Sequence, residues 1–327
     1  MITSKELAKI CGVSIGTIDR ALHDRGGISA ATKEKILRVS KELGYRPHLT
    51  ARNLKIGKTM TVGVVVFDLD NQFFSQLLNS LVHHAREEGY FLHVTLSEHS
   101  IERELECLDH LVSMPVDGIL IVPTNQGTEF TRFAKSLNVP IVSLGNRISA
   151  SIPFVAIDDR GAMRTCVEVL SRKGYQKIIY VSPPLSYKGK ENIYAVSERY
   201  AGYKEGARHC GMRPVVIDEK DALDKIPSMV RSSPERTAVL CSSDIYALKT
   251  LTALDHAGLR VPQDVGLMGF DDIDLLEYVN PPLTSVSQEI EQLAGVGFRV
   301  LRQLIEGDPA APSVTLTNFR IVERQST

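Results

Sequence analysis

From residue 60 onward, short runs of β-branched and aliphatic residues alternate with amphipathic helical patterns, and this alternation limits the possible folds more than any other feature. The expected strands are 62–67, 91–96, 118–122, 140–144, 154–157, 177–181, 214–217, 237–241 and 265–269, with helical patterns between most of them, such as 73–88, 101–113, 159–173, 197–210 and 243–257. This order is typical of βαβ units and parallel sheets. Nine strands are many for one doubly wound sheet, so we expect two similar lobes with a ligand cleft between them, outside the carboxyl ends of the strands.

The first 45 residues have helical periodicity instead. Thr3 and Glu6 form a capping-box pattern, and Gly12 marks the end of the helix that they begin. Ser14 and Ser29 are each followed by a further helical pattern, so they are expected to cap a second and a third helix. Two helices joined by a short glycine-containing turn predict a helix-turn-helix. The expected apolar faces are Leu7, Ala8 and Ile10, then Ile18, Ala21 and Leu22, then Ile36, Val39 and Leu43.

Charge separates this head from the rest of the chain. Residues 1–60 contain 12 Lys and Arg and 5 Asp and Glu, a net charge of +7. The remaining residues contain 26 bases and 34 acids, so the formal charge of −1 for the whole chain is the sum of +7 and −8. A basic head on an acidic body suggests that the head meets a polyanion while the body stays away from it.

Three short motifs look like enzyme signatures but lack the context that those signatures need. Residues 12–16 read G-x-S-x-G, but a helix precedes Ser14 where a nucleophile elbow requires a strand. Residues 57–59 look like the end of a phosphate-binding loop, but Arg52 stands where its first glycine would be. Residues 295–300 begin a G-x-G without its third glycine. No nucleophile, base and oxyanion donor can be assembled, so we expect no enzymatic activity.

Other features bear on metals and on location. The pair His83 and His84 has no partner at metal-ligand spacing, so no metal or cofactor is expected. The longest apolar runs are much shorter than the roughly 20 residues that a membrane span needs, and the first residues do not form a secretory signal. The 5 cysteines are widely spaced and are expected to be reduced thiols. These features favour a cytoplasmic protein that does not bind a membrane.

Several longer motifs occur together in a fixed order. In the head they are TSKELAKICGVSIGTIDRAL (3–22), ISAATKEKI (28–36) and LGYRPHLTARNL (43–54); in the body they are ERYAGY (198–203), SSDIYAL (242–248), DVGLMGFDDID (264–274) and PPLTSVSQ (281–288). This set resembles the LacI/GalR family of transcriptional regulators along the whole chain. The resemblance implies a small all-helical helix-turn-helix headpiece followed by a two-lobed α/β core with parallel sheets, like the type I periplasmic binding proteins.

The second helix of a helix-turn-helix enters the major groove with its N-terminal residues against base edges. Arg20 can reach guanine or a phosphate, Ile15 can cover a thymine methyl group, and Thr17 can donate to a phosphate. The family implies the same for Ile15, Gly16 and Arg20. Asp19 departs from the small hydroxyl residue that is common there, and its charge requires Arg20, Arg25 or cytosine N4 as a partner. The predicted DNA-binding residues of the headpiece are Thr3, Ser14, Ile15, Gly16, Thr17, Asp19 and Arg20.

The segment after the headpiece is too short to form a stable isolated helix. Residues 48–55 make about one and a half turns, which are not stable alone in water. The segment resembles the family's hinge helix, which orders when two subunits pair on DNA and inserts a leucine into the minor groove. Ala51 and Leu54 match those positions. A plain linker is the alternative.

In the body, polar and aromatic residues stand where the expected strands end. Sugar hydroxyls bind carboxylates, amides and guanidinium groups, with an aromatic ring against the apolar face of the sugar. The resemblance to ribose-type binding proteins implies a ligand site at matching positions. The predicted effector-binding residues are Asn71, Phe73, Phe74, Asn146, Arg147, Arg199, Ser243, Asp271 and Gln288. Ser243 stands where an asparagine is usual, and Asp244 and Asp272 are expected to be structural rather than to touch the ligand.

Together these features predict a homodimeric regulator, most simply a repressor, that binds a palindromic operator in double-stranded DNA and responds to a sugar or polyol. A purine or a phosphorylated effector is the alternative within this class, and a sugar-binding transport component is the alternative outside it. The expected domains are the headpiece 1–47, the hinge and linker 48–60 and the two-lobed core 61–327. The N-lobe is expected at 61–158 and 289–311, and the C-lobe at 159–286 and 312–327.

Overall fold

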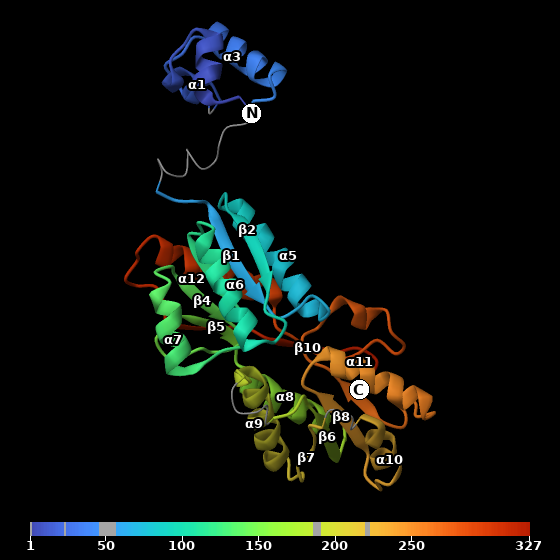
Figure 1. Ribbon diagram of the computed structural model, residues 1–327. Helices are drawn as coiled ribbons and strands as arrows, with labels where there is room; N and C mark the ends of the chain where they lie inside the picture. Colours follow the sequence, from blue (N-terminus) through green and yellow to red (C-terminus); the bar gives the residue numbers. More distant parts are fainter. Residues whose placement is uncertain (1, 23, 46–56, 186–190, 220–222) are drawn as a thin grey trace. The chain divides into compact units, whose positions relative to one another are not determined.

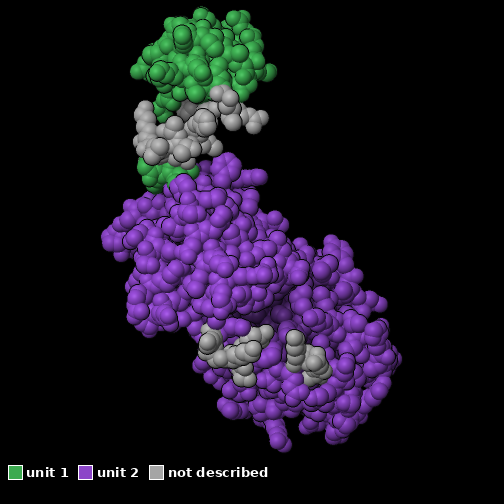
Figure 2. Space-filling view, in the orientation of Figure 1, with its two compact units in different colours: residues 1–59 green, residues 60–327 purple. Residues whose placement is uncertain are grey.

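The structure is a computed structural model that describes residues 2–22, 24–45, 57–185, 191–219 and 223–327. It divides into two compact units, residues 1–59 and residues 60–327. Figure 2 colours the two units separately. Within the described ranges, no helix is both long enough and apolar enough to cross a membrane.

The described residues of the first unit contain the helices α1 (Ser4–Cys11), α2 (Ile15–Leu22) and α3 (Ala30–Glu42). The three expected N-caps are confirmed: Thr3 forms a full capping box with Glu6, and the hydroxyls of Ser14 and Ser29 accept from the amides of Thr17 and Thr32. Gly12 ends α1 in the left-handed conformation at a φ of 70°, which a residue without Cβ adopts at little cost. The core of this unit is Leu7, Ala8, Cys11, Ile18, Ala21 and Ile36.

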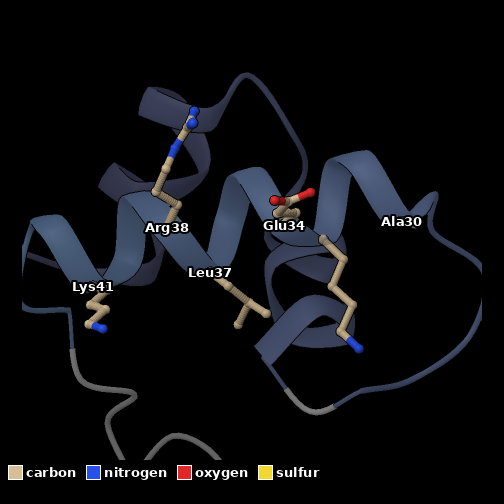
Figure 3. Close-up of a pocket in the computed structure, with 6 residues that line it drawn as sticks. Ala30, Glu34, Leu37, Arg38 and Lys41 are labelled. Carbon is tan, nitrogen blue, oxygen red and sulfur yellow. The ribbon is translucent and has the colours of Figure 1, made fainter.

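Two apolar residues of the headpiece lie outside this core. Ile10 and Leu43 were expected on the inner faces of their helices, but both are exposed. Cys11 takes the buried position in α1 instead, because it lies one turn after Leu7 and Ala8 on the same face. The surface of α3 also carries an exposed apolar residue, Leu37, in a pocket that Figure 3 shows; Arg38 extends from one side of the helix, and Leu37 and Lys41 extend from the other.

The second unit begins with a parallel six-stranded sheet in the order β11-β5-β4-β3-β1-β2. The strands are β1 (Thr61–Val66), β2 (Phe91–Leu96), β3 (Gly118–Ile121), β4 (Ile141–Leu144), β5 (Phe154–Ile157) and β11 (Val314–Thr317). Alternate residues of β1 face opposite layers: Val62, Val64 and Val66 share a core cluster with one pair of helices, and Val65 shares another cluster with a second pair. The central strands β1, β3, β4 and β5 are thus buried on both faces, as is usual in parallel sheets, whereas the edge strands β2 and β11 are largely exposed.

Four helices cover this sheet. Helices α5 (Gln72–Glu87) and α12 (Ile290–Ile305) pack together on one face, and α6 (Ile101–Ser113) and α7 (Gly127–Ser136) cover the other face (Figure 1). Gly63 in β1 permits the close approach of α6, since a Cβ there would lie 2.8 Å from a methyl carbon of Leu111.

The second lobe has a parallel four-stranded sheet in the order β7-β6-β8-β9. Its strands are β6 (Lys177–Val181), β7 (Val215–Ile217), β8 (Thr237–Cys241) and β9 (Gly266–Met268). Helices α8 (Asp159–Arg172) and α9 (Tyr194–His209) lie side by side on one face (Figure 1), and α10 (Ile226–Arg231) and α11 (Asp244–His256) cover the other. Two single-turn 3₁₀ helices complete the lobe, η1 (Leu223–Lys225) and η2 (Asp274–Glu277). The predicted two-lobed α/β class is confirmed.

The chain crosses between the lobes three times, after β5, after β10 (Ser285–Ser287) and before β12 (Arg320–Val322). The expected boundary at the third crossing is wrong. Residues 312–327 were assigned to the C-lobe, but β11 pairs in parallel with β5 in the first sheet, with Val314 opposite Phe154. Only the chain after β11 reaches the second lobe, where β12 pairs with β10. A short turn inside what looked like one strand, near 314–322, separates the two pairings.

Candidate functional site

The exposed side of α2 carries the residues that were predicted to face DNA. Ile18 and Ala21 hold the helix to the headpiece core, and Ile15, Gly16 and Arg20 are exposed. Ile15 is 51% exposed, which is high for an isoleucine in a capped helix and leaves its side chain free to contact another molecule. One face of α2 is therefore structural, and the other is available for recognition.

The polar residues around α2 already have partners within the headpiece. Ser14 Oγ accepts from the Thr17 amide at 3.1 Å, and the two hydroxyls lie 2.9 Å apart. Asp19 pairs with the Arg25 guanidinium at 3.3 Å, so one of the cations expected to neutralise Asp19 does so. Thr3 Oγ1 accepts from the amide of Glu6 at 3.2 Å at the start of α1. Ala51 and Leu54 lie outside the described residues.

In the second unit, the candidate effector residues centre on a buried guanidinium. Arg199 in α9 donates through Nε to Asp159 Oδ1 at 2.7 Å and through Nη1 to the Ser242 carbonyl at 2.7 Å. Its Nη1 also lies 3.5 Å from Asp271 Oδ1, and its Cζ lies 3.8 Å from the centre of the Phe270 ring. Because Arg199 has two carboxylate partners and a π face, its charge is compensated away from water.

Asp271 is the carboxylate that connects this cluster to the crossing before α12. Its Oδ1 accepts from Gln288 Nε2 at 2.7 Å, and both side chains are buried. Burial raises the pKa of Asp271 above the ordinary range of a carboxyl group, although the charge of Arg199 opposes the shift. The carboxyl group of Asp271 thus lies between an amide, to which it is hydrogen-bonded, and a guanidinium, with which it forms an ion pair.

The N-terminal end of α5 contacts the second lobe at Leu275. Asn71 caps the helix by accepting from the Phe73 amide at 3.1 Å, and Phe73 and Phe74 are both buried. Gln72 Oε1 accepts from the Leu275 amide at 3.2 Å, which joins the first lobe to the segment just after Asp271. Phe73 and Phe74 follow Gln72 in the sequence and pack edge to face, with their ring centres 5.3 Å apart.

A second junction connects the end of β4 to the start of α9. Asn146 Oδ1 accepts from the Ala195 amide at 3.0 Å, and its Nδ2 donates to the Asn192 carbonyl at 3.3 Å. The Asn192 side chain donates in turn to the carbonyl of Arg147 at 3.1 Å. Asn146 thus holds the two lobes together through both ends of its amide. Ser243 is the N-cap residue of α11, but its side chain makes no capping bond.

Two residues of these junctions were not selected from the sequence. Asp159 follows β5, so the rule that ligand groups stand after strand ends could have found it. Asn192 lies in a loop before α9, and no sequence pattern distinguishes it. Within the described ranges, no group of three or more His, Cys, Asp or Glu side chains could hold a metal ion.

Comparison with known proteins identifies this architecture. Residues 3–48 match the model of bacterial regulatory proteins of the lacI family, and residues 167–327 match a periplasmic binding protein-like domain. The ribose operon repressor of Halalkalibacterium halodurans is 29% identical over 94% of this chain and 92% of its own. The lac repressor dimer bound to operator and an anti-inducer superposes with a TM-score of 0.86, at 26% identity over 99% of this chain and 98% of that one. The chain belongs to the LacI family.

A further relative extends the comparison to a bound sugar. The transcriptional regulator CelR, solved as a cellobiose complex, matches with a TM-score of 0.69 at 26% identity, over 100% of both chains. This LacI-family protein is accordingly a ligand-responsive, DNA-binding transcriptional regulator, as the sequence predicted. The proteins that it resembles are regulators, which agrees with the expectation that it is not an enzyme.

Proposed function

We propose that this LacI-family regulator is a repressor controlled by a sugar or polyol that binds between its two lobes. The observation that supports this most is the buried cluster of Arg199, Asp271 and Gln288, in which a guanidinium, a carboxyl and an amide lie within 3.5 Å of a neighbour. These groups now bond to one another, so a polyhydroxyl ligand can exchange one set of hydrogen bonds for another. The proposed effector site consists of Asn71, Phe73, Phe74, Asn146, Arg147, Arg199, Ser243, Asp271 and Gln288.

The chemistry of this set favours a sugar over a flat, apolar ligand. Vicinal hydroxyl groups both donate and accept, which suits a carboxyl beside a guanidinium, and a phenylalanine ring suits the apolar face of a pyranose or furanose. The names of the relatives point the same way: one is a ribose operon repressor and another was solved with cellobiose. We propose that a sugar effector of this protein binds at the residues of the proposed effector site between the two lobes.

For DNA, we infer a cytoplasmic homodimer in which the two copies of α2 enter successive major grooves of a palindromic operator. The exposed side chains of Ile15 and Arg20 would reach base edges. Gly16 has no side chain, so the protein backbone of α2 can approach the DNA closely. Thr17 would donate to a phosphate, and Thr3 and Ser14 complete the proposed DNA-contacting set. Asp19, which is paired with Arg25, would accept from cytosine N4 rather than face a phosphate. Ala51 and Leu54, in the hinge segment expected at 48–60, would contact the minor groove.

A thermal-shift panel of D-ribose, D-xylulose, cellobiose, myo-inositol, ribose 5-phosphate and hypoxanthine tests the effector class. A ligand at 100 times its dissociation constant stabilises the folded state by about 2.7 kcal/mol, which is readily measured. We expect a shift with at least one neutral sugar or polyol, lost in Asp271→Ala and kept in the control Asp255→Ala, which changes an exposed carboxylate of α11. A shift with hypoxanthine or the phosphosugar alone would replace the sugar by that class.

A further inference from the structure

The backbone that presents Asp271 to the cluster is strained. Asp271 has a φ of 118° and Asp272 a φ of 58°, two successive residues with a Cβ in a region that favours glycine. Such a conformation persists only where the surroundings impose it, and it is found most often at binding sites. Contacts outside the ligand-binding set must therefore hold this turn.

The principal contact is the fully buried carboxyl group of Asp244 at the start of α11. Its Oδ2 accepts from the Ile273 amide at 2.9 Å, and its Oδ1 accepts from the Ser285 hydroxyl at 2.6 Å. Ser285 Oγ in turn accepts from the Asp272 amide at 3.2 Å. One carboxyl group thus fixes the amides of two consecutive residues, one directly and one through a hydroxyl.

Gly269 leaves space for the carboxyl group of Asp244, and Arg324 holds the turn at a second point. A Cβ on Gly269 would lie 2.0 Å from Asp244 Oδ1, so only glycine fits beneath the carboxyl group. On the other side of the turn, Arg324 Nη1 donates to Asp272 Oδ1 at 2.8 Å and to the Leu283 carbonyl at 2.9 Å. The turn is held at its amides by Asp244 and at its side chain by Arg324.

We propose that Asp244 is a positioning residue of the effector site: through the Ile273 amide and the Ser285 hydroxyl it imposes the strained 271–273 turn and so directs Asp271 toward Arg199 and Gln288. This inference rests on the proposed function, because it concerns the same cleft. Asp244 is fully buried, so it would act through the turn and not by contact with the ligand. It orders the site before the effector binds, which lowers the entropic cost of binding.

The electrostatics around Asp244 favour its neutral form. Burial raises its pKa, and the nearby carboxylates of Asp271 and Asp272 raise it further. Cys241 is the other titratable group that faces it, and among the described residues no Lys or Arg forms an ion pair with it. A neutral carboxyl and an amide have the same shape. When Asp244 is protonated at Oδ1, Oδ2 still accepts from the Ile273 amide, but the bond to Ser285 reverses, so that Oδ1 donates and Ser285 Oγ accepts. Asparagine reproduces this protonated arrangement with its oxygen and its nitrogen.

Hydrogen exchange of the full-length protein tests the role directly, without need of an identified effector. Amide protection in the peptide that covers 269–275 is compared between wild type, Asp244→Ala, Asp244→Asn, Ser285→Ala and the control Asp255→Ala. We expect Asp244→Ala to lower protection there by about tenfold or more, because the turn loses both anchors. Ser285→Ala should lower it less, since only the Asp272 amide is released. Asp244→Asn and Asp255→Ala should match wild type.

The conservative variant Asp244→Asn distinguishes a specific role of Asp244 in holding the turn from a general effect on the stability of the protein. In wild type, protection of this peptide should fall as the pH rises and Asp244 ionises, whereas in Asp244→Asn it should not depend on pH in that range. Wild-type protection in both Asp244→Ala and Ser285→Ala would overturn the proposal, and so would a loss in Asp244→Asn equal to that in Asp244→Ala. If no compound of the thermal-shift panel binds while the exchange results hold, the proposed effector class fails and the positioning role stands.

Discussion

The two recognition surfaces of this regulator are built in opposite ways. In the headpiece, Ile15 and Arg20 project from a helix that is held by other residues, so recognition and folding are assigned to different side chains. In the body, the proposed effector residues Arg199 and Asp271 are buried and form an ion pair with each other, so the same side chains would recognise the ligand and hold the lobe together. A substitution in the headpiece can therefore change binding alone, whereas a substitution in the cleft changes binding and stability together.

The sharpest test of this contrast removes the buried cation. Arg199→Met keeps most of the side-chain volume but leaves Asp159 and Asp271 without their shared partner. Breaking a buried ion pair on one side costs about 3 to 5 kcal/mol, because a carboxylate remains without compensation in the interior. We expect a loss of that order in the free energy of unfolding of residues 60–327, measured by urea denaturation.

A matched variant shows whether burial is the reason. Arg160 in α8 also forms ion pairs, with Glu198 and Glu205, but it is exposed. Exposed pairs contribute about 0 to 1 kcal/mol, so Arg160→Met should change stability little. Equal losses in the two variants would contradict the distinction between buried and exposed charges.

The contrast also explains what could be predicted from the sequence. The headpiece depends on local patterns, and its caps at Thr3, Ser14 and Ser29 were all located correctly. In the body, the nine expected strands are present because β-branched runs report burial directly. A structural role was expected for Asp244, but its partners in the turn and the junction residue Asn192 were not predicted, because the contacts join residues up to 67 positions apart in the sequence. Local patterns do not encode such contacts, and the misplaced third crossing has the same cause.

The second prediction concerns pH. Burial raises the pKa of Asp244 from 3.8 to about 8, so the folded state binds this proton more tightly than the unfolded state does. The stabilisation is complete below about pH 4 and is lost as the pH rises toward 8. Urea denaturation across this range should show a steeper decline for wild type than for Asp244→Asn; parallel profiles would mean that Asp244 is ionised throughout.

The headpiece provides the third prediction, in which binding changes without stability. Arg20→Ala should weaken operator binding by about 1 to 3 kcal/mol if the guanidinium reads a base. Because Arg20 is exposed, the unfolding free energy should change by less than about 0.5 kcal/mol. Fluorescence anisotropy with an operator selected from random duplexes measures operator affinity, and urea denaturation measures the free energy of unfolding. Lys5→Ala, at an exposed position of α1, is a control for the loss of one positive charge.

The smallest expected effect concerns Thr3, a headpiece residue that is predicted to contact DNA and also stabilises the fold. Thr3 is a predicted DNA contact, but its hydroxyl also caps α1, and the bond from the Thr3 amide lowers the pKa of Glu6. Thr3→Ala removes the cap and should cost the first helix about 1 kcal/mol. Amide protection in residues 4–11 of the full-length protein should fall accordingly, and Thr3→Ser should restore it because serine keeps the hydroxyl. If Thr3→Ala weakens operator binding by more than it weakens α1, then Thr3 itself contacts DNA. If the loss of operator affinity equals the loss of α1 stability, Thr3 contributes to DNA binding only by stabilising the helix. The headpiece would then also contain a residue whose substitution changes stability and binding together.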